Sequence, residues 1–255
     1  MIESRKSDLV GGHQVLALLK MALEFLEQNP LCVCVQEVSN IKHLLGENDF
    51  IKVRQKTSHV LLRLTEADFH VEAKITIPDM NYPDKAVVTE IVSCNFPANF
   101  VRYFGAQATE LARQCVEPPP PRRLKNGTIK PAPPFSPKPS LGTVASFLIS
   151  MVKRYPTEKC SLCGIRAFPR KPSEIVTNEN AHNFVERVYC SHIFHHGCID
   201  GYMKTPPFTG GKKCPGCENI IYHDKWRASE QTREERWAHQ QAKQRELDEI
   251  EDFLS

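Results

Sequence analysis

The chain has 255 residues, of which 41% are hydrophobic and 25% are charged, and its formal net charge is +3 at pH 7. These values are typical of a soluble protein with one large or two modest domains, and the small net charge argues against a nucleic-acid or anionic-membrane partner. No apolar run approaches the roughly 18 residues of a membrane span. The apolar stretch 14–26 contains Lys20 and Glu24, and no small-residue cleavage site follows it. We therefore expect an intracellular protein of the cytoplasm or nucleus.

The N-terminal half predicts an α+β domain in the order helix, antiparallel meander, helix. Residues 14–27 place apolar side chains on one side of a helix that Asn29-Pro30 ends. Strands are predicted at 31–35, 51–54, 59–64, 69–77 and 87–92. The strict alternation of apolar and polar residues at 69–77 predicts a strand with one buried and one solvent-exposed face. Pro97 then begins a helix with an apolar stripe, formed by Phe100, Phe104, Ala108, Leu111 and Cys115.

This order, together with Ile-Thr-Ile-Pro-Asp-Met-Asn-Tyr-Pro-Asp-Lys at 75–85, resembles the RWD domain over roughly residues 10–116. The second proline usual in that family is missing, with Ala86 nearby. The resemblance implies the fold of ubiquitin-conjugating enzymes without their catalytic cysteine, and hence a binding role. No His-Pro-Asn segment precedes Cys94, so Cys94 and Cys115 are expected to be ordinary buried cysteines, and Cys32-Val-Cys34 is expected to pack on one face of a strand.

A proline-rich stretch at 117–140 follows, in which nine of 24 residues are proline and five Lys or Arg accompany one Glu. Such a sequence favours extended polyproline II structure. It predicts a stiff spacer at a domain boundary, with a docking peptide or a basic import signal as the alternatives. A connecting helix is predicted at 141–155, with Val144, Leu148, Met151 and Val152 on one side, packing on one or the other domain.

The second half contains eight cysteines and histidines arranged as four pairs. In a reducing compartment, clustered cysteines indicate metal binding or catalysis rather than disulfide bonds. A structural zinc site takes four N or S ligands in a tetrahedron, and a Cys-x2-Cys turn supplies two of them. The spacing therefore predicts two Zn²⁺ ions per chain. The candidate ligands are Cys160, Cys163, Cys190, His192, His195, Cys198, Cys214 and Cys217.

The same series resembles the RING finger in its variant with two central histidines, over residues 156–224. The resemblance implies an interleaved pairing. Cys160, Cys163, His195 and Cys198 would hold the first zinc, and Cys190, His192, Cys214 and Cys217 the second. His196 is the chemical rival of His195, although the spacing favours His195, while His182 and His223 are expected at the surface.

The RING resemblance also implies a function. RING fingers that bind ubiquitin-conjugating enzymes carry an aliphatic residue in the first knuckle, an aromatic residue four positions after the sixth ligand, and a proline after the seventh. Leu162, Tyr202 and Pro215 stand there. We therefore expect a ubiquitin ligase without a covalent intermediate, whose partners are a conjugating enzyme, ubiquitin and a protein substrate. Glu218 replaces the basic residue that many active ligases carry after the last ligand. The alternative is accordingly a non-catalytic zinc-dependent scaffold protein.

The last segment, 225–255, predicts a charged C-terminal helix with an apolar end at Leu247, Ile250 and Leu254. A solvated helix is the default interpretation of this composition. A short partner-binding helix is the alternative.

Overall fold

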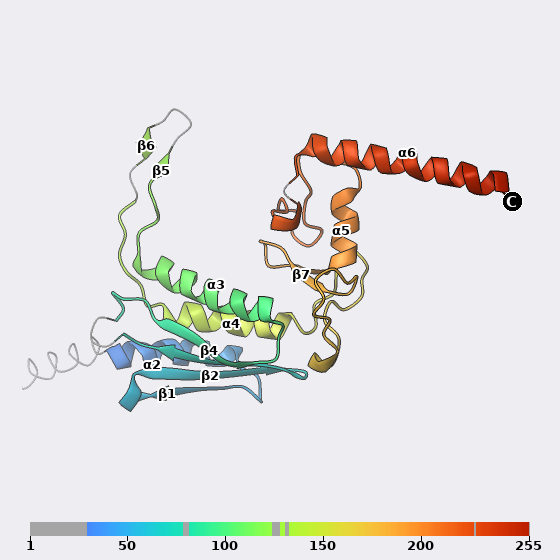
Figure 1. Ribbon diagram of the computed structural model, residues 1–255. Helices are drawn as coiled ribbons and strands as arrows, with labels where there is room; N and C mark the ends of the chain where they lie inside the picture. The colour runs from blue at the N-terminus through green and yellow to red at the C-terminus, as the bar shows by residue number, and fades with distance from the viewer. Residues whose placement is uncertain (1–29, 79–81, 124–127, 131–132, 227, 255) are drawn as a thin grey trace, which may run out of the picture. The chain divides into compact units, whose positions relative to one another are not determined.

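The computed structural model describes residues 30–78, 82–123, 128–130, 133–226 and 228–254 (Figure 1). The chain divides into two compact units, Met1–Lys153 and Arg154–Ser255. The expected α+β class with an antiparallel sheet is confirmed. The helix predicted at 14–27 lies outside the described residues. Among the described helices, none combines the length and the apolar composition needed to cross a membrane.

The first unit is a four-stranded antiparallel sheet with helices before and after it. Its elements are α2 (Pro30–Ile41), η1 (Lys42–Leu44), β1 (Phe50–Arg54), η2 (Gln55–Thr57), β2 (His59–Glu66), β3 (Phe69–Thr76), β4 (Val88–Cys94), α3 (Ala98–Val116), β5 (Arg122–Arg123), β6 (Ile129–Lys130) and α4 (Leu141–Arg154). The four strands from β1 to β4 lie within two residues of the strands predicted between 51 and 92, and α3 begins directly after Pro97.

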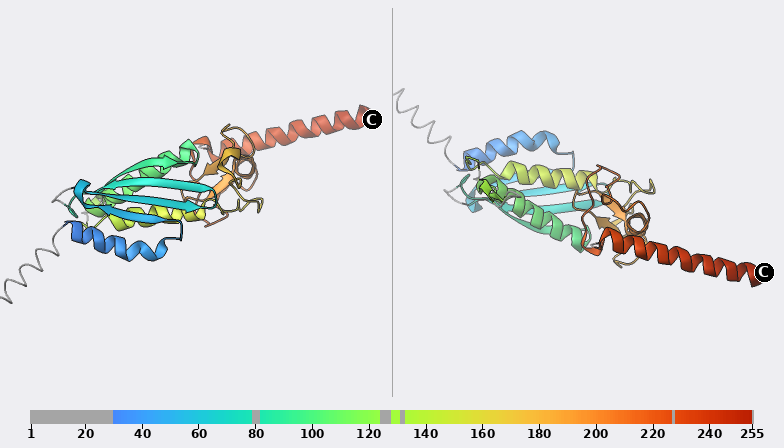
Figure 2. Two further views of the ribbon diagram at one scale, coloured as in Figure 1. Left: turned by 90° about the horizontal axis from the view of Figure 1, so that it is seen from below. Right: turned by 90° about the horizontal axis from the view of Figure 1, so that it is seen from above.

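The sheet is a meander in the order β1-β2-β3-β4. Its register pairs Val60 with Ile75 and Leu64 with Val71, and these apolar residues are buried. The two views of Figure 2 show α2, α4 and α3 side by side on one face of the sheet, with α4 in the middle. The alternation read from residues 69–77 therefore reflects a sheet with one covered face.

The strand predicted at 31–35 is wrong, because these residues form the first part of α2. The buried residues Cys34, Val38 and Ile41 are spaced by four and three positions, which is the spacing of a helix stripe. The five-residue alternation from Leu31 to Val35 was too short to distinguish a strand from a helix. Pro30 is the first residue of α2, a position that proline favours.

Helix α4 belongs to the first unit, so the boundary between the units lies at its C-terminal end and not in the proline-rich stretch. Six of its residues are buried, namely Leu141, Val144, Ala145, Leu148, Ile149 and Val152. Its Phe147 ring contacts the Tyr103 ring of α3 edge to face, with the centroids 5.8 Å apart. The apolar stripe of the predicted connecting helix thus packs within the first unit. The proline-rich stretch precedes it and contains the short hairpin of β5 and β6.

A buried polar network holds the N-terminal end of α4. The Tyr82 hydroxyl accepts the backbone N–H groups of Ser140 (2.9 Å) and Leu141 (3.1 Å) and donates to the Glu37 carboxylate of α2. The other Glu37 oxygen accepts the Gly142 N–H at 2.8 Å. Three backbone N–H groups at the start of α4 therefore have side-chain acceptors, as a buried helix terminus requires.

The C-terminal end of α4 is anchored by Lys153. Its ammonium group lies 2.7 Å from Oδ2 of Asp49, whose side chain is fully buried, and it donates to the Thr65 carbonyl at 2.7 Å. Asp49 also accepts the backbone N–H groups of Gly46 and Thr65, each at 2.7 Å. This ion pair ties the last described helix of the first unit to the segment that enters β1.

The second unit contains short helices and strands separated by loops, followed by the long helix α6. They are η3 (Pro172–Glu174), β7 (Val185–Arg187), β8 (Ile193–His195), α5 (His196–Lys204), η4 (Asp224–Trp226) and α6 (Glu230–Leu254). β7 and β8 form an antiparallel hairpin. The predicted C-terminal helix corresponds to α6, and Leu247 and Ile250 on it are exposed.

Candidate metal centre

The first ligand pair lies in a tight turn. Gly164 donates its N–H to the Cys160 carbonyl at 2.8 Å, and Cys160 donates to the Ile165 carbonyl at 2.8 Å. Gly164 has a φ of +74°, a left-handed conformation that glycine adopts without steric cost. The turn directs Cys160 and Cys163 toward one point.

The fourth ligand pair repeats this turn. Glu218 donates to the Cys214 carbonyl at 2.8 Å, and Cys214 donates to the Asn219 carbonyl at 2.7 Å. Glu218 occupies the place of Gly164 and has a φ of +61°. A residue with a Cβ atom pays about 1 kcal/mol or more for this conformation. The fourth pair therefore has the same turn geometry as the first pair, but with backbone strain at Glu218.

The two central pairs flank β8. Cys190 and His192 lie in the turn between β7 and β8, where Ser191 has a φ of +68°. His195 ends β8, and Cys198 follows in the first turn of α5. The Ser191 carbonyl accepts hydrogen bonds from the Arg154 guanidinium and from the Tyr155 hydroxyl, the latter at 3.2 Å. The segment that begins the second unit thus fixes the turn that carries the second pair.

The structure gathers the eight candidate ligands into two groups of four. The first contains Cys160, Cys163, His195 and Cys198, and the second contains Cys190, His192, Cys214 and Cys217. In each group the four ligand atoms lie within 4.8 Å of one another. The groups coincide with those that the RING resemblance implies, and the pairs alternate between the groups along the chain.

The distances within each group fit a tetrahedral ion. Nδ1 of His195 lies 3.3 Å from Sγ of Cys163 and 3.9 Å from Sγ of Cys198, and Nδ1 of His192 lies 3.5 Å from Sγ of Cys190. A zinc ion with ordinary Zn–S and Zn–N bonds places such atoms about 3.6 Å apart. Each group could therefore hold one metal ion, and its ligand chemistry is consistent with zinc.

The electrostatics of the thiols also favour a cation. Burial and the neighbouring Cys160 and Cys163 thiols raise the pKa of Cys198 to about 12, and burial raises the pKa of Cys214 to about 12. Burial opposes ionisation of Cys160 as well, but backbone hydrogen bonds outweigh it and lower the pKa of that thiol. Several crowded thiolates repel one another unless a metal ion compensates their charge, and binding of the ion deprotonates them.

The surroundings of the histidine of the first group favour the neutral form that a metal requires. Burial lowers the pKa of His195, against hydrogen bonding to the backbone at Arg166 and Ala167. Such outer hydrogen bonds orient a metal-binding imidazole ring. His196, its chemical rival, belongs to neither group and instead places Nδ1 at 3.2 Å from the Glu186 carboxylate.

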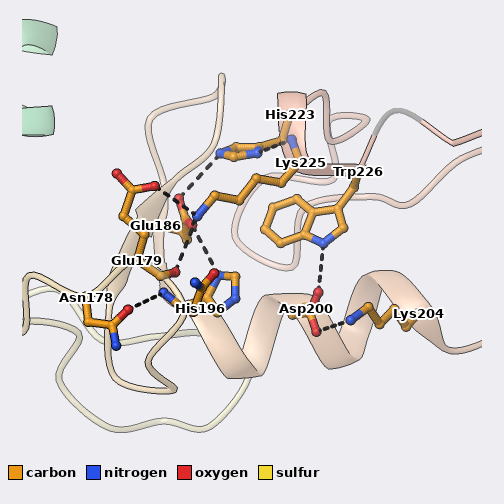
Figure 3. A network of polar contacts seen from close by, with 10 residues as sticks. Asn178, Glu179, Glu186, His196, Asp200, Lys204, His223, Lys225 and Trp226 are labelled. Atoms are coloured by element: carbon orange, nitrogen blue, oxygen red, sulfur yellow. Dashed lines mark hydrogen bonds and ion pairs between the residues drawn. The ribbon is translucent and has the colours of Figure 1, made fainter.

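Glu186 organises a polar network that the sequence did not reveal (Figure 3). Its buried carboxylate pairs with Lys225 and lies 3.5 Å from Nε2 of His223. Burial opposes ionisation, but these contacts lower the pKa of Glu186 to about 2. The surface position expected for His223 is therefore wrong, because its side chain is only 17% exposed. His182 is exposed, as expected.

The network ties η4 to the hairpin of β7 and β8, which carries candidate metal ligands. Trp226 of η4 donates its indole N–H to Asp200 of α5 at 3.0 Å, and its ring lies 4.6 Å from the His223 ring. Glu186 stands on β7, and Asp200 on α5, so η4 contacts both elements that flank β8 (Figure 3). Neither an isolated glutamate nor a lysine after the last ligand gives a sequence signal for this packing.

The three residues predicted to contact a conjugating enzyme lie close to the candidate metal ligands. Leu162 and Tyr202 are half-buried and pack on one apolar cluster with Cys160, Phe194 and Cys214. The Tyr202 hydroxyl donates to the Lys213 carbonyl at 2.8 Å, next to Cys214. Pro215 is exposed within the fourth pair. Both ligand turns and α5 thus contribute to one apolar cluster.

No family model matches the chain, and no curated protein matches it either.

Proposed function

We propose that the chain is a RING-type ubiquitin ligase with an N-terminal RWD-like binding domain. The observation that carries the proposal is the alternation of four ligand pairs between two groups, combined with Leu162, Tyr202 and Pro215 beside these groups. Bound zinc would supply structural support, because four N and S ligands leave no open position for substrate.

The proposed mechanism is catalysis by orientation. Leu162, Tyr202 and Pro215 bind a ubiquitin-loaded conjugating enzyme and hold its thioester in a reactive pose while a substrate lysine attacks. No covalent intermediate forms on this chain. Burial raises the pKa of Cys94 to about 11, which makes its thiol a poor nucleophile at neutral pH. The first unit contributes substrate or partner contacts.

The second candidate is a scaffold protein in which zinc only maintains an interaction surface. Glu218 supports it, because this residue follows the last ligand, is exposed, and carries the opposite charge to the residue that many active ligases place there. A ligase that lacks this basic contact depends more strongly on its other contacts with the conjugating enzyme.

The test is ubiquitin-chain formation by the purified zinc-loaded protein with a panel of conjugating enzymes. We expect activity with at least one enzyme, and a loss of about tenfold or more in Leu162→Ala, because hydrophobic contacts at an interface centre contribute on the order of 2 kcal/mol. Val88→Ala is the matched control, since Val88 is 66% exposed on β4 of the first unit. If folded protein with two zinc ions formed no ubiquitin chains with any enzyme of the panel, the result would favour the scaffold.

A further inference from the structure

A run of four prolines lies exposed between α3 and β5 of the first unit. Helix α3 ends at Val116, and Glu117 continues the chain in an extended conformation, with φ of −112° and ψ of 138°. The prolines at 118–121 follow outside any helix or strand, and all four are exposed. Figure 1 shows the chain extending here from the end of α3 away from the sheet. The whole run is therefore accessible to a partner.

Proline at four successive positions restricts the backbone of this run. The proline ring fixes φ at about −65° and disfavours the helical conformation for the preceding residue. These restrictions favour a polyproline II helix, which has three residues per turn. Positions 118 and 121 then share one edge of the helix, positions 117, 120 and 123 share a second edge, and positions 119 and 122 share the third. Because this conformation exists before binding, little conformational entropy is lost when a partner binds.

Both ends of the run are anchored to the first unit. The Glu117 N–H donates to the Arg113 carbonyl at 2.9 Å, and the Arg113 guanidinium lies 2.7 Å from the Glu117 carboxylate. At the other end, β5 pairs with β6, with Arg122 opposite Lys130. The ion pair offsets the only acidic charge beside the run, and residues 117–123 contain two arginines. The structure therefore presents the prolines from two fixed ends, next to a positively charged sequence.

The proline-rich sequence after β6 has a different environment, because it packs on α3. The Lys138 N–H donates to the Cys115 carbonyl at 2.9 Å. Pro134 and Phe135 line a hollow together with Leu111 of α3, and Phe135 is half-buried. Packing on the first unit thus accounts for prolines after β6. It does not account for the four exposed prolines before β5.

The exposed run and β5 together contain the pattern Pro-x-x-Pro-x-Arg, at Pro118, Pro121 and Arg123. Residues 117–140 contain two further Pro-x-x-Pro pairs, at 131 and 134 and at 134 and 137, but neither has a basic residue two positions later. The aromatic-lined grooves of SH3-type domains bind Pro-x-x-Pro segments in the polyproline II conformation. The pair in the exposed run is thus also the pair that an arginine follows.

We propose that residues 118–123 dock in the aromatic-lined groove of an SH3-type domain whose groove has an acidic rim. A helix with three edges presents two of them to a groove and one to solvent. Pro118 and Pro121 on the first edge fill the apolar part of the groove, and Arg123 on the second edge pairs with a carboxylate of the rim. The third edge, at positions 119 and 122, does not contact the domain. The segment contains none of the candidate metal ligands, so docking there is independent of the proposed ligase activity.

The test is a calorimetric titration of the zinc-loaded full-length protein with a panel of purified SH3 domains that have acidic groove rims. We expect saturable binding of one domain per chain for at least one member of the panel. Binding should weaken at higher salt concentration, because salt screens the ion pair at the rim. A synthetic peptide of residues 116–123 should compete with the protein for the same domain. Absence of saturable binding throughout the panel, or binding with which the peptide does not compete, would overturn the proposal.

Variants on different edges of the run distinguish docking from general attraction to a basic, proline-rich sequence. Pro118→Ala, Pro121→Ala and Arg123→Ala should each raise the dissociation constant at least tenfold. Pro119→Ala and Arg122→Ala are the matched controls on the third edge, and each should change it less than threefold. Zinc content and unchanged amide-exchange protection of β2 and β3 establish that each variant is folded. Equal weakening in the control variants, or weakening by the two arginine substitutions alone, would contradict docking in a groove and overturn the proposal.

Discussion

Chelation of the metal should unfold the second unit and leave the first unit folded. Both groups of candidate ligands described by the structure lie between Cys160 and Cys217, all in the second unit. The chain has two tryptophans, Trp226 and Trp237, and both also lie in the second unit. Trp226 is packed near His223 and hydrogen-bonded to Asp200. Tryptophan fluorescence therefore reports on the second unit alone.

The size of the stability loss on metal removal follows from the composition of the core around the ligands. Of the seven buried residues in the apolar cluster, two are the ligands Cys160 and Cys214, so the cluster cannot close unless the ligands are held together. Structural zinc contributes about 10–16 kcal/mol per site in small zinc domains. A whole domain is stable by about 5–15 kcal/mol. The stabilising free energy lost on removal of even one ion should therefore exceed the free energy of unfolding of the second unit.

The assay is titration with a strong chelator, with fluorescence and circular dichroism followed in parallel. We expect tryptophan emission to move to that of exposed indole, while the strand signal and the amide-exchange protection of β2 and β3 persist. Readdition of two equivalents of zinc should restore the emission. Unchanged protection of β8 and α5 amides after complete metal removal would refute the reasoning, because the apolar cluster would then suffice to fold the unit.

Three further predictions concern single residues. Asp49→Asn should destabilise the first unit by about 2–3 kcal/mol at pH 7, as expected for loss of charged hydrogen bonds. Burial opposes ionisation of Asp49, but Lys153 and the backbone N–H donors lower its pKa. The stability advantage of the wild type should therefore be complete above the unfolded pKa near 4 and should vanish as the pH falls further. Amide exchange of Thr65 measures this stability difference, and a difference independent of pH would contradict the prediction. Tyr82→Phe should cost about 1–3 kcal/mol in urea unfolding, because buried N–H groups of α4 lose their acceptor, whereas Tyr222→Phe, at a 65% exposed residue, should cost nothing measurable. Glu218→Arg should raise ubiquitin-chain formation severalfold, because it restores the basic residue that many active ligases carry after the last ligand. Glu218→Gly should only relieve about 1 kcal/mol of left-handed strain, seen as a higher melting temperature. Equal rates of chain formation in both variants would oppose a role for a basic residue at position 218.

Much of the architecture could be predicted because its signals are local. The alternation at 69–77 extends over nine residues and has only one periodic interpretation, and β3 occupies Phe69–Thr76. The ligand pairs are equally explicit, since a turn that holds two cysteines requires their close spacing. The ligand groups also follow a spacing rule, because His195, not His196, reaches the Cys160 pair.

The remaining features depend on contacts between distant segments. Residues 31–35 allowed both a strand and a helix, and burial at Val38 and Ile41 decided for α2. The position of α4 depends on Tyr82 and Glu37, which lie 58 and 105 residues from their partners Ser140 and Gly142. Hydrophobic periodicity could predict that a helix would form there, but not which unit would bury it.

The two ligand groups should behave as one cooperative unit, because β8 joins them. His192 of the second group and His195 of the first are separated only by Ile193 and Phe194, and both of these side chains are buried. A shift of β8 that releases either histidine must therefore move the other histidine and expose part of the apolar cluster. Loss of one ion would therefore weaken the other site through the strand itself, so zinc release should follow a single transition instead of two. Such coupling would give a chain with so small an apolar cluster an advantage from alternating its ligand pairs, because each ion would hold segments that the other site also needs.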